Sequence, residues 1–198
     1  GGAGTIFTKQ DSQAYGDLLI SNEGNFGANT SIIESRAFDS FNMSRGASVI
    51  INGSFTVTTP FVNVSNAWLT INSSAVLNTS RIGISRGVII NYGNITGSTV
   101  INISSGKSNL SGKFNISTLR VMGDADLGHE RFHPLNITAI NVTIEFGGTI
   151  NLTRRGEFGG ASGSGSGRGG GIGTVSSASG AGGAGYGGNG SGGSTNGL

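Results

Sequence analysis

Cysteine is absent from this sequence, and its 198 residues include only two prolines. Charged residues make up 11% of the chain, whereas about 25% is usual in soluble domains. Without cysteine there is no disulfide framework and no thiolate metal site, although a secreted domain of this size can fold on a continuous core alone. The net charge is +2 and the basic residues are scattered, so we expect no nucleic-acid partner.

Long apolar runs are also missing. No stretch approaches the roughly 18 apolar residues that a membrane-spanning helix requires, so we expect no membrane span. The chain opens with Gly1-Gly2-Ala3-Gly4 and shows neither an initiator methionine nor a signal peptide. We therefore interpret it as a mature or excised piece of a longer precursor.

Small polar residues dominate what is present: 38 Gly, 19 Asn, and 44 Ser and Thr together. Such a composition predicts disorder when apolar residues are scarce, but Ile and Val recur in short clusters up to about residue 152. We divide the chain into an opening β segment or cap (1–47), a β-helical body (48–155) and a Gly-rich segment (156–198).

The apolar clusters predict strands rather than helices, because they are short, rich in β-branched residues and bounded by turn formers. No amphipathic helix is recognisable, so the predicted class is all-β. The expected strands are Thr5–Lys9, Asp17–Ser21, Ser48–Ile51, Phe55–Thr58, Phe61–Val64, Trp68–Ile71, Gly87–Ile90, Thr99–Ile103, Lys113–Ser117, Leu119–Met122, Ile137–Phe146 and Thr149–Leu152.

A degenerate repeat suggests how these strands are arranged. Asn52, Asn72 and Asn91 follow similar apolar runs at nearly equal intervals. Their spacing, a period of roughly 20 residues, favours one coil of a single-stranded parallel β-helix, that is, a solenoid, or a repeated hairpin. A β-sandwich is the alternative fold. The two ends of a solenoid need caps or neighbours, so such domains tend to associate end to end.

Glycine makes up nearly half of the Gly-rich segment. One interpretation is a flexible linker to a next unit. The other is an ordered layer in which extended strands pack closely because side chains are missing.

The strongest motif is the N-X-S/T sequon. Composition alone would place a Ser or Thr two residues after Asn in about four cases, whereas fourteen of the 19 Asn residues have one. Each is a potential N-glycosylation acceptor. The sequons begin at Asn29, Asn42, Asn52, Asn63, Asn72, Asn78, Asn94, Asn102, Asn109, Asn115, Asn136, Asn141, Asn151 and Asn189.

The phase of the sequons within the expected strands is informative. Alternate strand residues face opposite sides, so Val62 and Val64 oppose Asn63, and the same phase recurs in several other strands. In the longest, Ile140, Val142, Ile144 and Phe146 are expected to share one face, with Asn141, Thr143 and Glu145 on the other. Because the aliphatic face must be buried, these Asn side chains should point to solvent, where a glycan can be carried. The alternative is an Asn ladder inside the coils, with Asn52, Asn72 and Asn91 stacked and no sugar.

Residues 120–133 form the densest polar cluster and contain both His residues. Asp124 and Asp126 would share a face if this stretch were extended, which makes them weak candidates for a paired-carboxylate or calcium site. His129 and His133 would suit a metal only on a helix, and Gly128 and Pro134 flank them badly for one. We favour a polar loop inserted between coils, with internal salt bridges. We therefore expect no catalytic residue, no metal and no cofactor other than covalent N-linked glycans.

Two segments near the N-terminus resemble a known kind of unit. Gly1–Lys9 and Tyr15–Asn22, read as GGAGTIFTK and YGDLLISN, are similar to a recurrent unit of large, Gly-rich, β-helical surface proteins. The resemblance is confined to these two segments and implies an adhesin, a surface stalk or an extracellular fibre. The density of sequons departs from typical bacterial members and favours a eukaryotic or archaeal secretory route.

The sequence therefore predicts a secreted or cell-surface structural glycoprotein, and not an enzyme. It would be a subunit or repeat module of an extracellular filament or appendage that associates head to tail, with residues 156–198 of one unit against Gly1–Lys9 of the next. The alternatives are a cell-surface adhesin domain that binds carbohydrate, or a polysaccharide lyase or hydrolase that uses the 120–133 cluster.

Overall fold

The computed structural model describes residues 4–25, 27–130 and 133–152. These residues form seventeen strands and no helix, so nothing among them is a helix able to cross a membrane. The chain divides into two compact units, Gly1–Asn151 and Leu152–Leu198, and the account below concerns the first. The predictions for residues 156–198 and for Asn189 lie outside the described residues.

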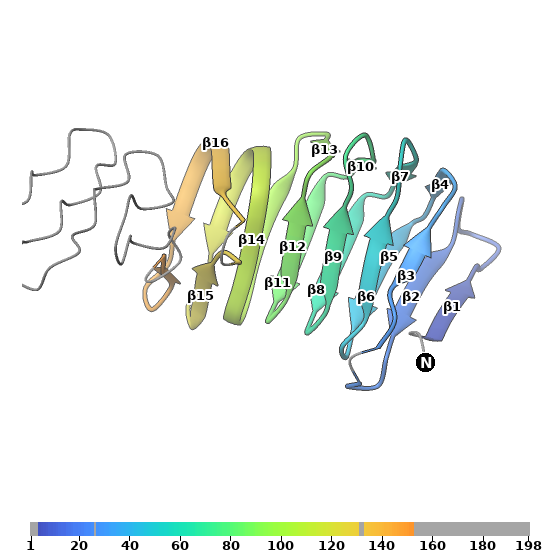
Figure 1. Cartoon of the computed structure of the whole chain (residues 1–198), viewed down its shortest axis with the longest axis horizontal. Helices are drawn as coiled ribbons and strands as arrows, with labels where there is room; N and C mark the ends of the chain where they lie inside the picture. The colour runs from blue at the N-terminus through green and yellow to red at the C-terminus, as the bar shows by residue number, and fades with distance from the viewer. Residues whose placement is uncertain (1–3, 26, 131–132, 153–198) are drawn as a thin grey trace, which may run out of the picture. The chain divides into compact units, whose positions relative to one another are not determined.

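The predicted fold is confirmed: the chain forms a parallel β-solenoid of about seven turns (Figure 1). Strand partners in neighbouring coils are separated by similar intervals along the sequence, as in the pairs Val76–Asn94 and Lys113–Asn136. Ser48, Trp68 and Val88 are paired in succession at equal intervals. The predicted period therefore corresponds to one coil.

Each complete coil has three faces. The first face begins with β2 (Asp17–Ser21), β5 (Ser40–Ser44), β8 (Phe61–Ser65) and β11 (Arg81–Ser85). The second begins with β3 (Thr30–Ile32), β6 (Ser48–Ile51), β9 (Trp68–Ile71) and β12 (Val88–Asn91). The third consists of β4 (Arg36–Ala37), β7 (Thr56–Thr58), β10 (Val76–Asn78) and β13 (Asn94–Thr96).

The remaining strands complete the two ends. β14 (Val100–Val121) is continuous through more than a full coil, and β15 (Ala125–Gly128), β16 (Leu135–Ile144) and β17 (Thr149–Ile150) stack beyond it. At the other end, β1 (Gly4–Thr8) pairs antiparallel with β2, against the parallel direction of the other ladders. β1 therefore covers the start of the first face.

One corner of the solenoid is built from left-handed residues. Arg45, Asn66 and Arg86 stand between the first and second faces of successive coils with φ of 51°, 48° and 52°. A left-handed conformation costs a non-glycine residue roughly 1–2 kcal/mol. It persists here because the backbone nitrogen of each residue donates to a carbonyl of the next coil, for example Asn66 N to Ser85 O at 2.8 Å. The stacking therefore fixes the bend.

The core consists of aliphatic and aromatic columns that run along the solenoid. On the first face one inward column is Leu18, Phe41, Val62, Ile82 and Ile101, and the next is Ile20, Met43, Val64, Ile84 and Ile103. All ten side chains are buried. Full burial of such a side chain stabilises the fold by roughly 1.5–3 kcal/mol, so the columns are the main source of stability.

The alternative of a three-membered Asn ladder holds for Asn52 and Asn72 and fails at Asn91. Asn91 pairs with Ile71, which in turn pairs with Ile51, so Asn91 belongs to an inward column. Asn72 does stack on Asn52, with Asn72 Nδ2 donating to Asn52 Oδ1 at 2.8 Å, and the residue that follows them in the third coil is Tyr92, whose nitrogen donates to Ile71 O. The apolar runs before the three Asn residues are similar, but Asn91 stands one residue earlier in the ladder than Asn52 and Asn72 do.

The expected common face of Ile140, Val142, Ile144 and Phe146 is also wrong. Val142 and Ile144 pair with the buried residues Leu119 and Val121 and point inward. Ile140 lies at a corner, where the ladder skips a pair between Ala139 and Asn141, and it is 83% exposed. At a corner the regular alternation of inward and outward side chains is interrupted. The direction of a side chain before the corner therefore does not predict the direction of one after it.

Candidate functional site

The sequon asparagines all lie outside the core wherever the structure describes them. Asn42, Asn52, Asn63, Asn72, Asn102 and Asn109 are half-buried, and Asn29, Asn78, Asn94, Asn115, Asn136, Asn141 and Asn151 are exposed. Asn91, which lacks a sequon, is 2% exposed. Three other asparagines without a sequon, Asn22, Asn25 and Asn66, also lie outside the core. Asn91 is therefore the one buried asparagine among the described residues, and no described sequon Asn is buried.

The first face carries three of these asparagines in one outward column. Asn42 pairs with Asn63, Asn63 pairs with Gly83, and Gly83 pairs with Asn102. Neighbouring strands are about 4.7–4.9 Å apart. Asn42 and Asn63 are therefore immediate neighbours, whereas Gly83 leaves an open position beside Asn63 and Asn102.

A column of hydroxyl groups runs beside the Asn column. Ser21, Ser44, Ser65, Ser85 and Ser105 are paired in succession, with a register shift in the ladder before the Ser85–Ser105 pair. Ser85 Oγ lies 2.8 Å from Ser105 Oγ. Ser44 and Ser65 are the hydroxyl residues of the Asn42 and Asn63 sequons. Residues i and i+2 share a strand face. The Asn and the hydroxyl residue of each of these sequons therefore both point outward, and together they form the polar surface of this face.

Some sequon amides already have hydrogen-bond partners. Asn42 Nδ2 donates to Ser40 Oγ at 2.9 Å, and Asn109 Nδ2 donates to Glu130 Oε1 at 2.5 Å. An amide nitrogen has two hydrogens, and an N-glycosidic bond replaces one of them. A sugar at either position could therefore coexist with the hydrogen bond, which would then fix its direction.

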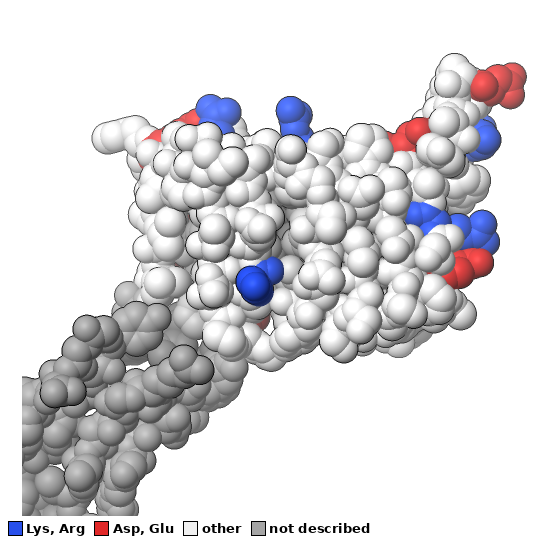
Figure 2. Space-filling model, turned by 90° about the horizontal axis from the view of Figure 1, so that it is seen from above, with Lys and Arg blue, Asp and Glu red and all other residues white. Residues whose placement is uncertain are grey.

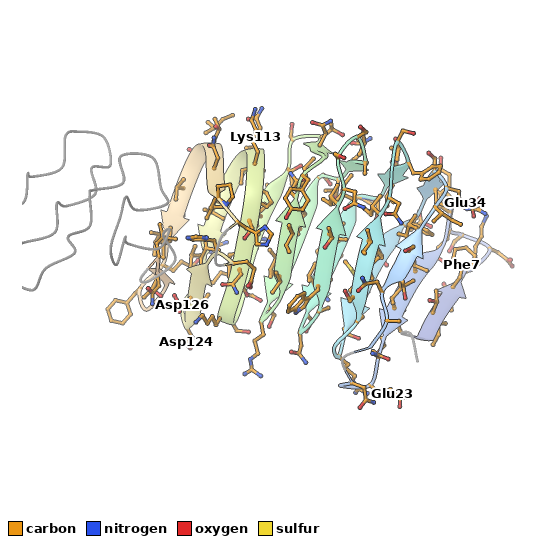
Figure 3. All side chains as sticks on the ribbon, viewed as in Figure 1. Phe7, Glu23, Glu34, Lys113, Asp124 and Asp126 are labelled. Carbon is orange, nitrogen blue, oxygen red and sulfur yellow. The ribbon has the colours of Figure 1, made fainter. Side chains whose placement is uncertain are left out.

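The two weak candidate acids, Asp124 and Asp126, do not lie together on one extended strand. Asp124 has φ of 63° and occupies a bend, and its carbonyl accepts a hydrogen bond from Gly106 N at 3.0 Å. Asp126 lies in β15, where Thr149 Oγ1 donates to Asp126 Oδ1 at 2.8 Å. Among the described residues no group of three potential metal-ligating side chains occurs. Figure 3 places both acids at the end of the solenoid opposite Phe7 and Glu34.

The predicted loop is only part of the 120–133 cluster, because Ala125–Gly128 forms strand β15. Asn109 pairs with Gly128 and Gly112 pairs with Leu135, so the second coil has a longer connection between these two pairs than the first. Of the extra residues in this connection, 129–130 and 133–134 are described, and we call these four residues the strap. Glu130 N donates to Ser111 Oγ at 2.9 Å, so the strap contacts the outward side of the second face.

The two histidines hold this strap and do not form an i, i+4 pair on a helix. His129 Nδ1 lies 2.9 Å from Glu130 O and 3.0 Å from His133 O. His133 Nδ1 lies 2.7 Å from Tyr92 Oη. Beyond the strap, Arg120 and Glu145 form an ion pair on the outside of the last two coils.

Charged side chains are otherwise sparse. In Figure 2 they stand singly or in small groups among large uncharged areas of the described surface. One carboxyl group has a perturbed acidity: a hydrogen bond from Ser40 Oγ at 2.5 Å, and a second from Gln13 Nε2, lower the pKa of Asp17. This group lies at the start of the first face, and its donor Ser40 Oγ also accepts the hydrogen bond from Asn42 Nδ2.

Sequence reasoning missed a cavity at the N-terminal end. It measures about 750 Å³ and opens among β1–β4, with Phe7, Tyr15, Leu18, Ile32, Ile33 and Phe38 in its lining. The Phe7 and Phe38 rings meet edge to face, with centroids 6.5 Å apart. The abundance of aromatic residues before residue 42 was the available signal, but only the fold shows that no further coil covers them within the described residues.

In comparisons with known proteins, no family model, no curated protein and no solved structure matches the chain.

Proposed function

We propose that this chain is a structural, N-glycosylated β-solenoid module of an extracellular filament or surface appendage. The observation that carries the proposal is the position of the sequons: every described sequon Asn lies outside the core, and the one buried asparagine among the described residues, Asn91, has no sequon. A glycan is bulky and solvated, so it can be carried only at outward positions.

A mechanical role suits the rest of the described molecule. Parallel ladders run through all the coils, so each coil is held by its neighbours along the axis. The outer faces carry Asn, Ser and Thr instead of charge, and sugars there would add a hydrated coat. We assign the chain no reaction of its own.

The C-terminal end of the solenoid supports head-to-tail association. Val142 and Ile144 continue inward columns whose preceding members, Leu119 and Val121, are buried, yet they are 56% and 49% exposed. An inward column that ends on exposed aliphatic side chains offers a surface to another coil. A second copy stacked along the axis would cover it and lengthen the shaft.

One observation favours a second candidate, a carbohydrate-binding adhesin domain. Trp68 is exposed on the second face, between Ser48 and Val88 in the neighbouring coils. An indole ring that lies on a flat surface can pack against the apolar face of a sugar ring. Saturable binding of an oligosaccharide by the isolated monomer, lost in Trp68→Ala, would favour this candidate.

Fibre diffraction tests the filament proposal on protein purified from its natural source. Because the strands run across the solenoid axis, aligned filaments should give a reflection at about 4.7–4.9 Å along the fibre axis. Electron microscopy of the same material should show unbranched filaments. Isolated particles of one chain at every concentration tested would contradict the proposal.

A further inference from the structure

Phe146 occupies an unusual position for a large apolar side chain. It lies at the tip of the tight turn that follows β16, where Gly148 N donates to Glu145 O at 2.9 Å and Gly147 has φ of 85°. This is the geometry of a type II turn, whose second central residue favours glycine. The turn fixes Phe146 at its first central position, where the side chain is fully exposed. It is therefore a protruding apolar knob at the C-terminal end of the solenoid.

The opposite end of the solenoid offers a matching hollow. The cavity of about 750 Å³ is lined by aromatic and aliphatic side chains that include Phe7, Tyr15 and Phe38. Its volume falls within the range of roughly 300–1,000 Å³ that is usual for ligand pockets, so it can admit one aromatic side chain. Ile33 stands at its mouth and is exposed.

Charges around the knob and the hollow have opposite signs. Asp124 lies against the Phe146 turn: a β-carbon on Gly147 would be 3.9 Å from Asp124 Oδ1. Lys9 lines the hollow, and no ion pair is found for it among the described residues. Glu34 and Arg36, which also line the hollow, pair with each other. Lys9 is thus the cation available to an incoming acidic turn.

We propose that Phe146 of one copy inserts into the N-terminal cavity of the next copy, with Asp124 of the first facing Lys9 of the second. The proposal rests on the proposed function and deepens it, because it names the contact that joins the modules. The occupant of the cavity is a second copy of this chain and not a free ligand.

The contact is heterologous, since the knob and the hollow are different surfaces at opposite ends of the solenoid. A heterologous contact that does not close into a ring propagates as an open filament. Each subunit added would present a new Phe146 at one end and a new cavity at the other.

Sedimentation of the full chain over a range of concentrations tests the proposal. The unsubstituted chain should form a ladder of growing species. Phe146→Ser and Ile33→Ser should each shift assembly to at least tenfold higher concentration. Trp68→Ser removes an exposed aromatic side chain from the flank and is the matched control, which should assemble like the unsubstituted chain. All three side chains are exposed, so the melting temperatures of the dilute variants should agree.

Mixing the two variants gives the sharpest result. A Phe146→Ser subunit keeps an intact cavity, and an Ile33→Ser subunit keeps an intact knob, so one junction can still form between them. The mixture should give heterodimers and no longer species. The charge-exchanged pair Lys9→Glu and Asp124→Lys should likewise associate more strongly in a mixture than either variant does alone.

Three results would overturn the proposal. One is assembly of Phe146→Ser at the same concentration as the unsubstituted chain, which would mean that filaments form through another contact while the proposed function stands. Another is a chain that stays monomeric at every concentration and whose native source also yields no filaments, which would remove the contact and the filament role together. Binding of an unrelated apolar ligand in the cavity, with no effect of Phe146→Ser, would identify a different occupant.

Discussion

Asn91 shows how one position in the register decides the role of a residue. Its Nδ2 donates to Lys113 O at 2.6 Å, and it stands in the inward column that contains Ile71. The sequence run before it resembles those before Asn52 and Asn72, which is why the sequence alone leaves a three-membered ladder as the alternative. A shift of one residue in a strand exchanges the inward and outward faces, and only the pairing reveals it.

Replacement of Asn91 should therefore cost stability. Asn91→Ala removes the donor to the Lys113 carbonyl from a buried position, and we expect a loss of about 1–3 kcal/mol in the free energy of unfolding. Asn91→Asp should cost more, because it loses the same donor and also places a carboxylate at a buried position. Asn78→Ala, at an exposed position, is the control and should stay within about 0.5 kcal/mol. Urea denaturation of unglycosylated protein measures all three, and equal stabilities would contradict the assigned register.

Asp17 gives a prediction about pH. Hydrogen bonds from Ser40 and Gln13 lower its pKa in the folded state. The stability that they contribute is thus present above the unfolded value, near 3.9, and is lost as the pH falls through the lower folded pKa. Ser40→Ala should raise the pKa of Asp17 toward its ordinary value. An NMR titration of the Asp17 carboxyl carbon measures the change, with Ser65→Ala as the control; an unchanged midpoint in Ser40→Ala would refute the cause.

At the scale of the strand, much of the pattern was predictable. β2, β6 and β9 have the bounds expected from their β-branched runs and flanking turn residues. β11 was missed because Gly83 interrupts Arg81–Ser85, and glycine in an isolated strand is unfavourable. In the solenoid, Gly83 is held by ladders on both sides, so neighbouring coils override local preference.

Corners limited the prediction in the same way. Alternation correctly opposes Asn63 to Val62 and Val64, which lie within one strand. It fails at Ile140, because β16 turns a corner without losing its strand geometry. No residue type at positions 139–141 marks that corner. The bend comes from the coil beneath, which the sequence does not display locally.

Gly112 tests the close packing between coils. Its φ is 102°, and a β-carbon there would lie 1.9 Å from Asn91 O, a backbone atom that cannot move aside. Gly112→Ala combines a left-handed strain of roughly 1–2 kcal/mol with overpacking of about 1–3 kcal/mol, so we expect a loss of at least about 2 kcal/mol. Gly53→Ala is the matched control: its φ is also positive, at 53°, but its nearest neighbour is the Phe55 ring at 3.7 Å. Thermal unfolding should separate the two variants clearly, and similar losses would contradict the stacking at Gly112.

On the scale of the whole described unit, the ends differ from the flanks. The flanks present hydroxyl and amide groups in columns, with few charges (Figure 2). The ends present apolar groups: Phe7, Ile33 and the cavity at one end, and Val142, Ile144 and Phe146 at the other. This distribution favours contact along the axis over contact between flanks, as a linear assembly requires. Apolar ends can be expected of any solenoid from its sequence. The protruding Phe146 and the N-terminal cavity are recognisable only in the folded structure.

The solenoid fold also explains part of the high number of sequons. Outward positions in a strand recur at i and i+2, and the solenoid fills them with Asn, Ser and Thr. Alternation therefore raises the number of N-X-S/T triplets above the four expected from composition. The exclusion of sequons from the core follows from this geometry, and the attachment of sugars is the part that a direct measurement must decide.

Glycopeptide mapping by mass spectrometry, on protein purified from its natural source, makes that measurement. The proposal predicts N-linked glycans at several of the outward sequons, including the exposed Asn78, Asn94 and Asn115, and an unmodified Asn91. Bare asparagine at every sequon, in protein isolated from its native compartment, would contradict the assignment of the outward columns as glycan carriers.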